Sequence, residues 1–93
     1  MSFTPKTAVE RAKDDLAKRL SIDVTAIREL NLADRDFPDM SLGAPLEGEM
    51  SAQMISSGWQ ITLGVDGNSY EYRGDKYQLR LHNFNGANYV IES

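Results

Sequence analysis

Apolar residues follow a helical spacing near the N-terminus of the chain. Between residues 4 and 21 they recur every three or four positions, at Val9, Ala12, Leu16 and Leu20. This spacing gives a helix one apolar stripe, which a sheet or another helix must cover. Thr4 with Pro5 at the first helical position, or Thr7 with Glu10 as a capping box, can begin the helix. The pattern therefore predicts one amphipathic N-terminal helix.

A strand-like alternation of apolar and polar residues begins at residue 58 and gives the clearest strand signal in the chain. The apolar positions of its first two runs are Trp59, Ile61, Leu63, Val65, Tyr70 and Tyr72. Residues 66–68, which read Asp-Gly-Asn, separate the two runs and are typical of a hairpin turn. The two runs therefore predict an antiparallel hairpin.

Two further turns extend this hairpin into a meander. Residues 74–76, Gly-Asp-Lys, lead into a third strand whose apolar positions are Tyr77, Leu79 and Leu81. An Asn-Gly turn at residues 85–86 leads into a short closing strand at residues 89–91. The apolar positions of the meander can share one face, which the helix would cover.

The stretch that follows the helix predicts one more strand. Asp23 can cap a brief turn, after which Leu30 and Leu32 would face inward and Glu29 and Asn31 outward. The expected fold class is α+β, with one N-terminal helix packed on an antiparallel sheet of about four or five strands and a long ordered loop.

The long loop is residues 36–50, DFPDMSLGAPLEGEM, which follow neither a helical nor a strand rhythm. Proline restricts the residue before it to extended backbone, so Pro38 and Pro45 fix the chain at two points. One interpretation, which we favour, is a packed excursion that uses Phe37, Leu42 and Leu46 to close the end of the core. The other is a stiff recognition loop that offers residues 39–42 to a partner such as a protease.

Length, composition and charge narrow the class of protein. The 93 residues suit a single domain, 1–93. The net charge of −4, with acidic and basic residues mixed along most of the chain, argues against nucleic acid as a partner. The chain has no cysteine, no signal-peptide pattern and no apolar stretch that could span a membrane, so we expect a cytoplasmic protein without a membrane partner.

The sequence offers no assembled catalytic or metal-binding set. His82 is the single histidine, and no patterned carboxylates accompany it, so we expect an ordinary surface residue. No phosphate-binding glycine motif occurs. We therefore expect no catalytic residues, no metal and no cofactor. Sheet aromatics at Trp59, Tyr70 and Tyr72 could stack a sugar, but a core face requires the same alternation, and we favour core or cross-strand packing over a ligand platform.

The segment from residue 37 to residue 75 resembles an uncharacterised bacterial domain whose members read roughly W-P-D-x-S-L-G-C-P-x-x-G and then Y-E-Y-H-T-D. The matching positions are Pro38, Asp39, Ser41, Leu42, Gly43, Pro45, Gly48, Gly58, Ile61, Tyr70, Glu71, Tyr72 and Asp75. The A-x-x-D-L-A-x-R-L helix, from Ala12 to Leu20, is similar too. The resemblance implies no activity, and its members are often exported proteins or lipoproteins.

This chain departs from that pattern at positions that bear on its compartment. Phe37 replaces the usual tryptophan, Arg73 the usual histidine, and Ala44 the loop cysteine. The family's second cysteine, near Leu81 or His82 here, is also missing. Loss of both is expected if they pair in an oxidising compartment and this cysteine-free variant resides in a reducing one. The resemblance then implies that the loop lies against the strand that carries Leu81 and His82, with Ala44 close to one of these two residues.

Taken together, these patterns favour a small non-catalytic domain that binds another, unknown protein and is a monomer or weak homodimer. The expected contacts are the 38–48 loop and an exposed sheet edge, with loop residues Asp39, Met40, Ser41, Leu42 and Glu47. An inhibitor-like role is one form of this hypothesis. The alternative is a small-ligand or saccharide-binding module that uses Trp59, Tyr70 and Tyr72, and an enzyme is the least favoured class.

Overall fold

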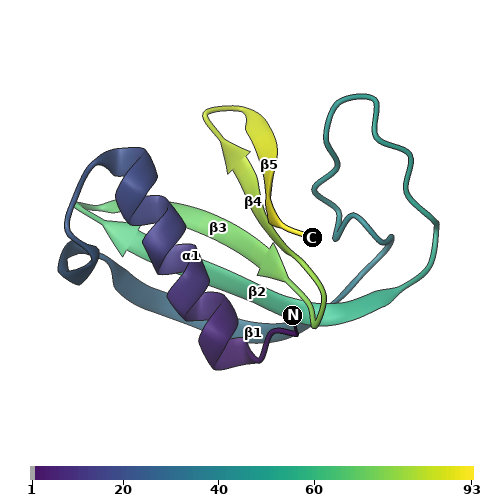
Figure 1. The fold of residues 1–93 in the computed structure, drawn as a ribbon, viewed down its shortest axis with the longest axis horizontal. Coiled ribbons are helices and arrows are strands. Elements are labelled where there is room, and N and C mark those ends of the chain that lie inside the picture. Colours follow the sequence, from purple (N-terminus) through teal and green to yellow (C-terminus); the bar gives the residue numbers. More distant parts are fainter. Residues whose placement is uncertain (1) are drawn as a thin grey trace.

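The computed structural model describes residues 2–93, which form one helix packed on a five-stranded antiparallel sheet. The elements in chain order are α1 (Pro5–Leu20), a short 3-10 helix (Val24–Ala26), β1 (Arg28–Phe37), β2 (Ser56–Val65), β3 (Asn68–Gly74), β4 (Leu79–Phe84) and β5 (Ala87–Glu92). The strand order is β1-β2-β3-β4-β5, so β1 and β5 are the two edges. Figure 1 shows α1 lying across one face of the sheet. The predicted α+β fold is confirmed.

The start of α1 is decided by the first of the two predicted caps. Thr4 is the N-cap and Pro5 is the first helical residue. The backbone N–H of Thr7 donates to the Thr4 hydroxyl over 3.2 Å, and the Thr4 N–H donates to the Thr7 hydroxyl over 2.8 Å. This reciprocal pair satisfies two amide groups that have no partner within the helix.

The core lies between α1 and the sheet face below it. The helix contributes a buried set formed by Ala8, Val9, Ala12 and Leu16, with Leu20 half-buried beside them. The sheet contributes Ile61, Leu63, Val65, Tyr72, Leu79 and Leu81. The predicted packing of the helical stripe on Ile61 and Leu63 is therefore confirmed. The Tyr72 hydroxyl reaches the helix and donates to Asp15 Oδ2 over 2.7 Å, so the single polar atom of this ring is satisfied.

Strand pairing divides the side chains between the two faces of the sheet. Directly opposite residues of antiparallel strands lie on the same face. One row, on the side of α1, consists of Leu32, Ile61, Tyr72, Leu81 and Tyr89. The next row, on the other side, consists of Ala33, Gln60, Arg73, Arg80 and Val90. The face away from α1 therefore carries long polar side chains.

Two sequence predictions about individual side chains are wrong. Leu30 and Leu32 do not both face the core, because they are 49% and 37% exposed. An irregularity in the pairing between Glu29 and Asn31 inserts Leu30 as an extra residue, which reverses its direction relative to Leu32. Tyr77 lies in the turn between β3 and β4 and is 68% exposed, so it is not an apolar position of β4.

The tight turns agree with their sequences. Asp66 and Gly67 both have positive φ, 49° and 81°, which a two-residue hairpin turn of the right twist requires. Asn85 and Gly86, at 52° and 85°, join β4 and β5 in the same way. These turns fix the register of β2 on β3 and of β4 on β5.

Candidate functional site

The connection between β1 and β2 spans residues 38–55 and contains no helix or strand. In Figure 1 it rises at the right of the view, near β4, β5 and the C-terminus. Hydrogen bonds from Arg80 to the Ala44 carbonyl oxygen and from Asn88 to the Pro45 carbonyl oxygen confirm this proximity. Because Arg80 belongs to the sheet row that points away from α1, the loop covers part of that second face.

The first part of the loop is a tight turn organised by Asp39. Its Oδ1 accepts the Ser41 N–H over 2.9 Å, the Ser41 hydroxyl over 2.6 Å and the Gly43 N–H over 3.1 Å. The hydroxyl of Ser41 and the Gly43 N–H hold the pKa of the Asp39 carboxyl below its usual range. Leu42 and Gly43 both adopt left-handed backbone, with φ of 59° and 64°. The carboxylate thus stabilises a conformation that is unfavourable for leucine.

Arg73 of β3 holds this turn from below. Its Nη1 donates to the carbonyl oxygens of Leu42 and Gly43 over 3.0 and 3.1 Å. Its Nε lies 2.5 Å from Glu71 Oε2, which balances the charge of the guanidinium. The same guanidinium stacks over the Phe37 ring, 5.5 Å from its centroid. Arg73 is only 9% exposed, so its guanidinium interacts with groups of the protein rather than with solvent or a partner.

Arg80 of β4 holds the second part of the loop. Its Nη1 donates to the Ala44 carbonyl oxygen over 3.1 Å. Its two terminal nitrogens also meet the two oxygens of Glu49, at 2.5 and 2.8 Å. These hydrogen bonds, with one from the Leu46 N–H, lower the pKa of Glu49 to about 2. Two buried arginines therefore clamp residues 42–49 onto the sheet.

The predicted contact residues of the loop divide into buried and exposed positions. Ser41 and Leu42 are fully buried, so neither is available to a partner. Asp39 is half-buried and its Oδ1 is occupied within the turn, as described above. Met40 and Glu47 are exposed. The geometry is that of a packed excursion, with the qualification that Leu46 is 38% exposed and does not close the core.

The later part of the loop carries the largest exposed apolar side chains. Met50 is 96% exposed, Ile55 75% and Met54 63%. Met40 lies close to this stretch, because its backbone N–H donates to the Ala52 carbonyl oxygen over 3.0 Å. We call Met40, Leu46, Met50, Met54 and Ile55 the loop apolar set. Large apolar side chains gathered on one exposed segment are a mark of interaction surfaces.

The aromatic residues proposed as a saccharide platform lie on the side of the sheet that α1 covers. Tyr72 is fully buried beneath the helix, as its hydrogen bond to Asp15 requires. Tyr70 and Trp59 are half-buried and pack against the core. The three rings therefore do not form an open row on which a sugar could stack.

His82 belongs to a polar row that crosses four strands on the face away from α1. The row consists of Asn31, Thr62, Glu71 and His82. Nδ1 of His82 lies 3.7 Å from Glu71 Oε2, and partial burial lowers the pKa of the imidazole. Within residues 2–93 no three His, Asp or Glu side chains gather as a metal site would require. Among residues 2–93, no Ser or Asp side chain forms a hydrogen bond with His82.

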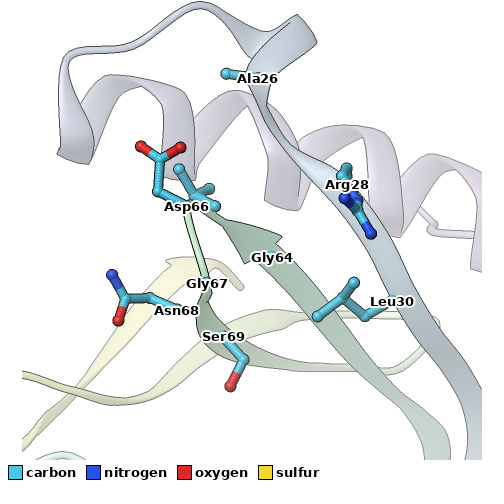
Figure 2. A pocket seen from close by; sticks show the side chains of 9 residues that line it. Ala26, Arg28, Leu30, Gly64, Asp66, Gly67, Asn68 and Ser69 are labelled. Carbon is cyan, nitrogen blue, oxygen red and sulfur yellow. The ribbon is translucent and has the colours of Figure 1, made fainter.

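A hollow lies at the end of the sheet where β2 turns into β3 (Figure 2). Its volume is about 350 Å³, and Leu30 and Arg28 stand on one side of it, opposite Asp66 and Asn68. Leu30 occupies the space over Gly64, where an added Cβ would lie 2.8 Å from the leucine side chain. The hollow is open and contains no group prepared for chemistry.

No helix within the described part of the chain is both long enough and apolar enough to cross a membrane.

Comparison with known protein families matches residues 9–82 to a family described as a domain of unknown function (DUF8738). The chain belongs to this family. The DUF8738 match includes most of α1, the whole β1–β2 loop and both arginines of the clamp. No curated protein and no solved structure matched the chain.

Sequence reasoning missed the clamp and the exposed segment at residues 50–55. Arg73 and Arg80 occupy polar positions of alternating strands, which predicts exposed side chains. The available signal was the loop itself, because a long connection without secondary structure must satisfy its carbonyl groups with side chains or water. Two arginines on the sheet face next to it are suitable donors.

Proposed function

We propose that this DUF8738 domain is a non-catalytic protein-binding domain that uses the β1–β2 loop as its contact surface. The observation that carries the proposal is the division of the loop into a fixed base and an exposed apolar part. Ser41, Leu42 and Ala44 are fully buried at the base. The loop apolar set is exposed above and beside it.

A fixed base matters for binding because ordering a loop costs conformational entropy. A loop that is already ordered loses less entropy on association than a free one. Methionine side chains add adaptability, since they are unbranched, polarizable and able to repack against different surfaces. Three of the five members of the loop apolar set are methionines.

The sheet edge at β1 is a weaker candidate for the contact surface. An exposed edge can add a strand from a partner, but charged residues and irregularities oppose such pairing. β1 carries Arg28, Glu29, Asp34, Arg35 and Asp36 in ten residues, and its pairing is irregular between Glu29 and Asn31. These features favour the loop over the edge.

The proposal also limits the inhibitor-like hypothesis and the saccharide hypothesis. With Ser41 and Leu42 buried, an inhibitor-like contact would rely on Met40 and the stretch after Glu49. The saccharide alternative has no open aromatic surface, because Tyr72 lies under α1. A bacterial origin, a cytoplasmic location and a monomeric or weakly dimeric state belong to the same proposal, and the lack of cysteine in the sequence agrees with a reducing compartment.

Affinity capture with matched surface variants tests the proposal. Replacing the whole loop by a flexible linker would remove buried core residues, so point variants are preferable. We expect Met50→Gln/Met54→Gln to lose proteins that the wild-type domain captures from a cell lysate while its thermal unfolding midpoint stays the same. Val24→Gln, at a 41% exposed apolar residue outside the loop, is the matched control and should retain them. An identical set of captured proteins for wild type and the double variant would contradict the proposal.

A further inference from the structure

Charge is distributed unevenly along this chain, and the uneven stretch coincides with the exposed loop. Residues 36–55 contain the four carboxylates of Asp36, Asp39, Glu47 and Glu49 and no Lys, Arg or His. The chain as a whole has 10 Lys and Arg residues against 14 Asp and Glu residues, so mixed charge is the rule elsewhere. The loop apolar set therefore lies within a segment whose charged side chains are all acidic.

The two cations beneath this segment do not neutralise its outer surface, whereas a third, Arg35, is exposed at the Phe37 end, where it donates to Gln60. Arg73 and Arg80 lie beneath the loop and are 9% and 6% exposed. Their donors are taken by loop carbonyls and by Glu71 and Glu49, as described above. Glu47 has no hydrogen bond to another described residue and is exposed. A partner that approaches the loop beside Leu46 thus meets the exposed Glu47 carboxylate, while the Arg80 guanidinium lies buried beneath.

We propose that the partner segment which binds this loop is basic and amphipathic, with an apolar face bordered by Lys or Arg side chains. This inference rests on the proposed function and adds the chemistry of the partner. The apolar face would pack on Met50, Met54 and Ile55, and the two methionines would adjust to it through their rotatable bonds. The flanking cations would meet Glu47, which steers the encounter and selects against acidic partners.

Two synthetic peptides of equal length test the inference. In one, Leu and Lys residues are spaced three and four apart so that a helix has one apolar and one basic face; in the other, Glu replaces every Lys. Binding to the isotope-labelled full chain is followed by NMR chemical shifts. We expect the Leu/Lys peptide to shift amide signals of residues 46–55 and the Leu/Glu peptide to leave them unchanged. Raising the salt from about 0.1 M to about 1 M shortens the Debye length from about 10 Å to about 3 Å and should weaken the binding.

Two charge-reversal variants identify the carboxylates that matter. Glu47→Lys should weaken binding of the Leu/Lys peptide by about tenfold, which corresponds to about 1.4 kcal/mol. Glu10→Lys makes the same charge change on an exposed residue of α1 and should leave the affinity within about twofold of wild type, or about 0.4 kcal/mol. Equal weakening by both variants would reduce the effect to net charge and overturn the inference.

The remaining outcomes separate this inference from the proposed function. Equal binding of both peptides at residues 46–55, or binding of neither, overturns the preference for a basic partner. The proposed function then still stands if Met50→Gln/Met54→Gln loses captured proteins. If that double variant captures the same proteins as wild type, the loop is not the contact surface, and both proposals fail.

Discussion

Arg80 and Glu49 join the β1–β2 loop to β4 through two parallel contacts, Nη1 to Oε1 at 2.5 Å and Nη2 to Oε2 at 2.8 Å. The same Nη1 donates to the Ala44 carbonyl oxygen at 3.1 Å. One buried guanidinium therefore fixes two points of the loop, five residues apart in sequence. Two parallel hydrogen bonds fix the orientation of the carboxylate relative to the guanidinium, in addition to the attraction of opposite charges.

Removing the Arg80 donors should destabilise the domain. Arg80→Met keeps most of the apolar stem but leaves the Ala44 carbonyl and the Glu49 carboxylate without their donor. Hydrogen bonds to charged groups contribute about 1.5–3 kcal/mol, and we expect the free energy of unfolding in urea to fall by about that amount. Arg28→Met is the control, because the Arg28 side chain is exposed and forms no hydrogen bond or ion pair with another described residue. A change below about 0.5 kcal/mol in both variants would show that the clamp carries no stability.

The same ion pair predicts an acid-dependent loss of stability. Hydrogen bonds from Arg80 and Leu46 lower the pKa of Glu49 from 4.5 to about 2 in the folded protein. The unfolded chain therefore takes up the proton first, and the stabilising contribution, complete above pH 4.5, is lost as the pH falls from 4.5 towards 2. Urea unfolding at a series of pH values should show a shallower acid dependence in Glu49→Gln than in wild type. Glu47→Gln, at an exposed carboxylate, should keep the wild-type slope; if Glu49→Gln keeps it too, the pair does not act in the folded state.

Two glycines of β2 should respond very differently to the same added methyl group. A Cβ at Gly58 would lie 2.1 Å from the Gly74 carbonyl oxygen, and backbone of the paired strand cannot move aside. We expect Gly58→Ala to cost about 3 kcal/mol or more in unfolding free energy. A Cβ at Gly64 would meet only the Leu30 side chain, which is half-exposed and can change rotamer, so Gly64→Ala should cost less than about 1 kcal/mol. Equal thermal unfolding midpoints for the two variants would contradict the strand register.

Docking of α1 on the sheet is tested by Leu16, which is fully buried in the core. Leu16→Ala should lower the free energy of unfolding by about 2–5 kcal/mol, because it removes buried methyl groups and leaves a cavity. Val24→Ala removes methyl groups from a 41% exposed residue and should change it by less than about 0.5 kcal/mol. The urea midpoints of the two variants should therefore separate clearly, and coincident midpoints would mean that α1 is not docked.

Local sequence signals were sufficient for most of the fold. Helix capping at Thr4 and the turns at residues 66–67 and 85–86 depend only on neighbouring residues, so the sequence predicts them. The single apolar stripe of α1 and the alternation in β2 and β3 then determine which faces meet. The inward positions on β2 and β3 were correctly predicted for that reason.

Most of the errors and omissions depend on contacts between residues that are distant in sequence. The irregular pairing between Glu29 and Asn31 reverses the direction of the Leu30 side chain, and no turn residue in the sequence predicts this irregularity. Arg73 and Arg80 obey the alternation that predicts solvent-exposed polar residues, yet the loop from 31 and 36 residues earlier buries them. Tyr77 has a side chain typical of strands but lies beside Asp75, whose carboxylate accepts the Tyr77 N–H and shapes a turn. Tertiary contacts therefore decide the exposure of Leu30, Arg73 and Arg80, and the turn at Asp75 decides that of Tyr77.

Amide hydrogen exchange measured by NMR on the wild-type chain distinguishes a fixed loop from a flexible linker most directly. The N–H groups of Ser41, Leu42, Gly43 and Ala44 all donate within the turn, to Asp39 or to Ser41. We predict that these four amides exchange slowly, at rates close to those of β3, while the amides of residues 53–55 exchange rapidly. Rapid exchange of all four turn amides, at the rates of an unfolded peptide, would contradict a loop held by Arg73 and Arg80 and with it the fixed base on which the proposed binding surface depends.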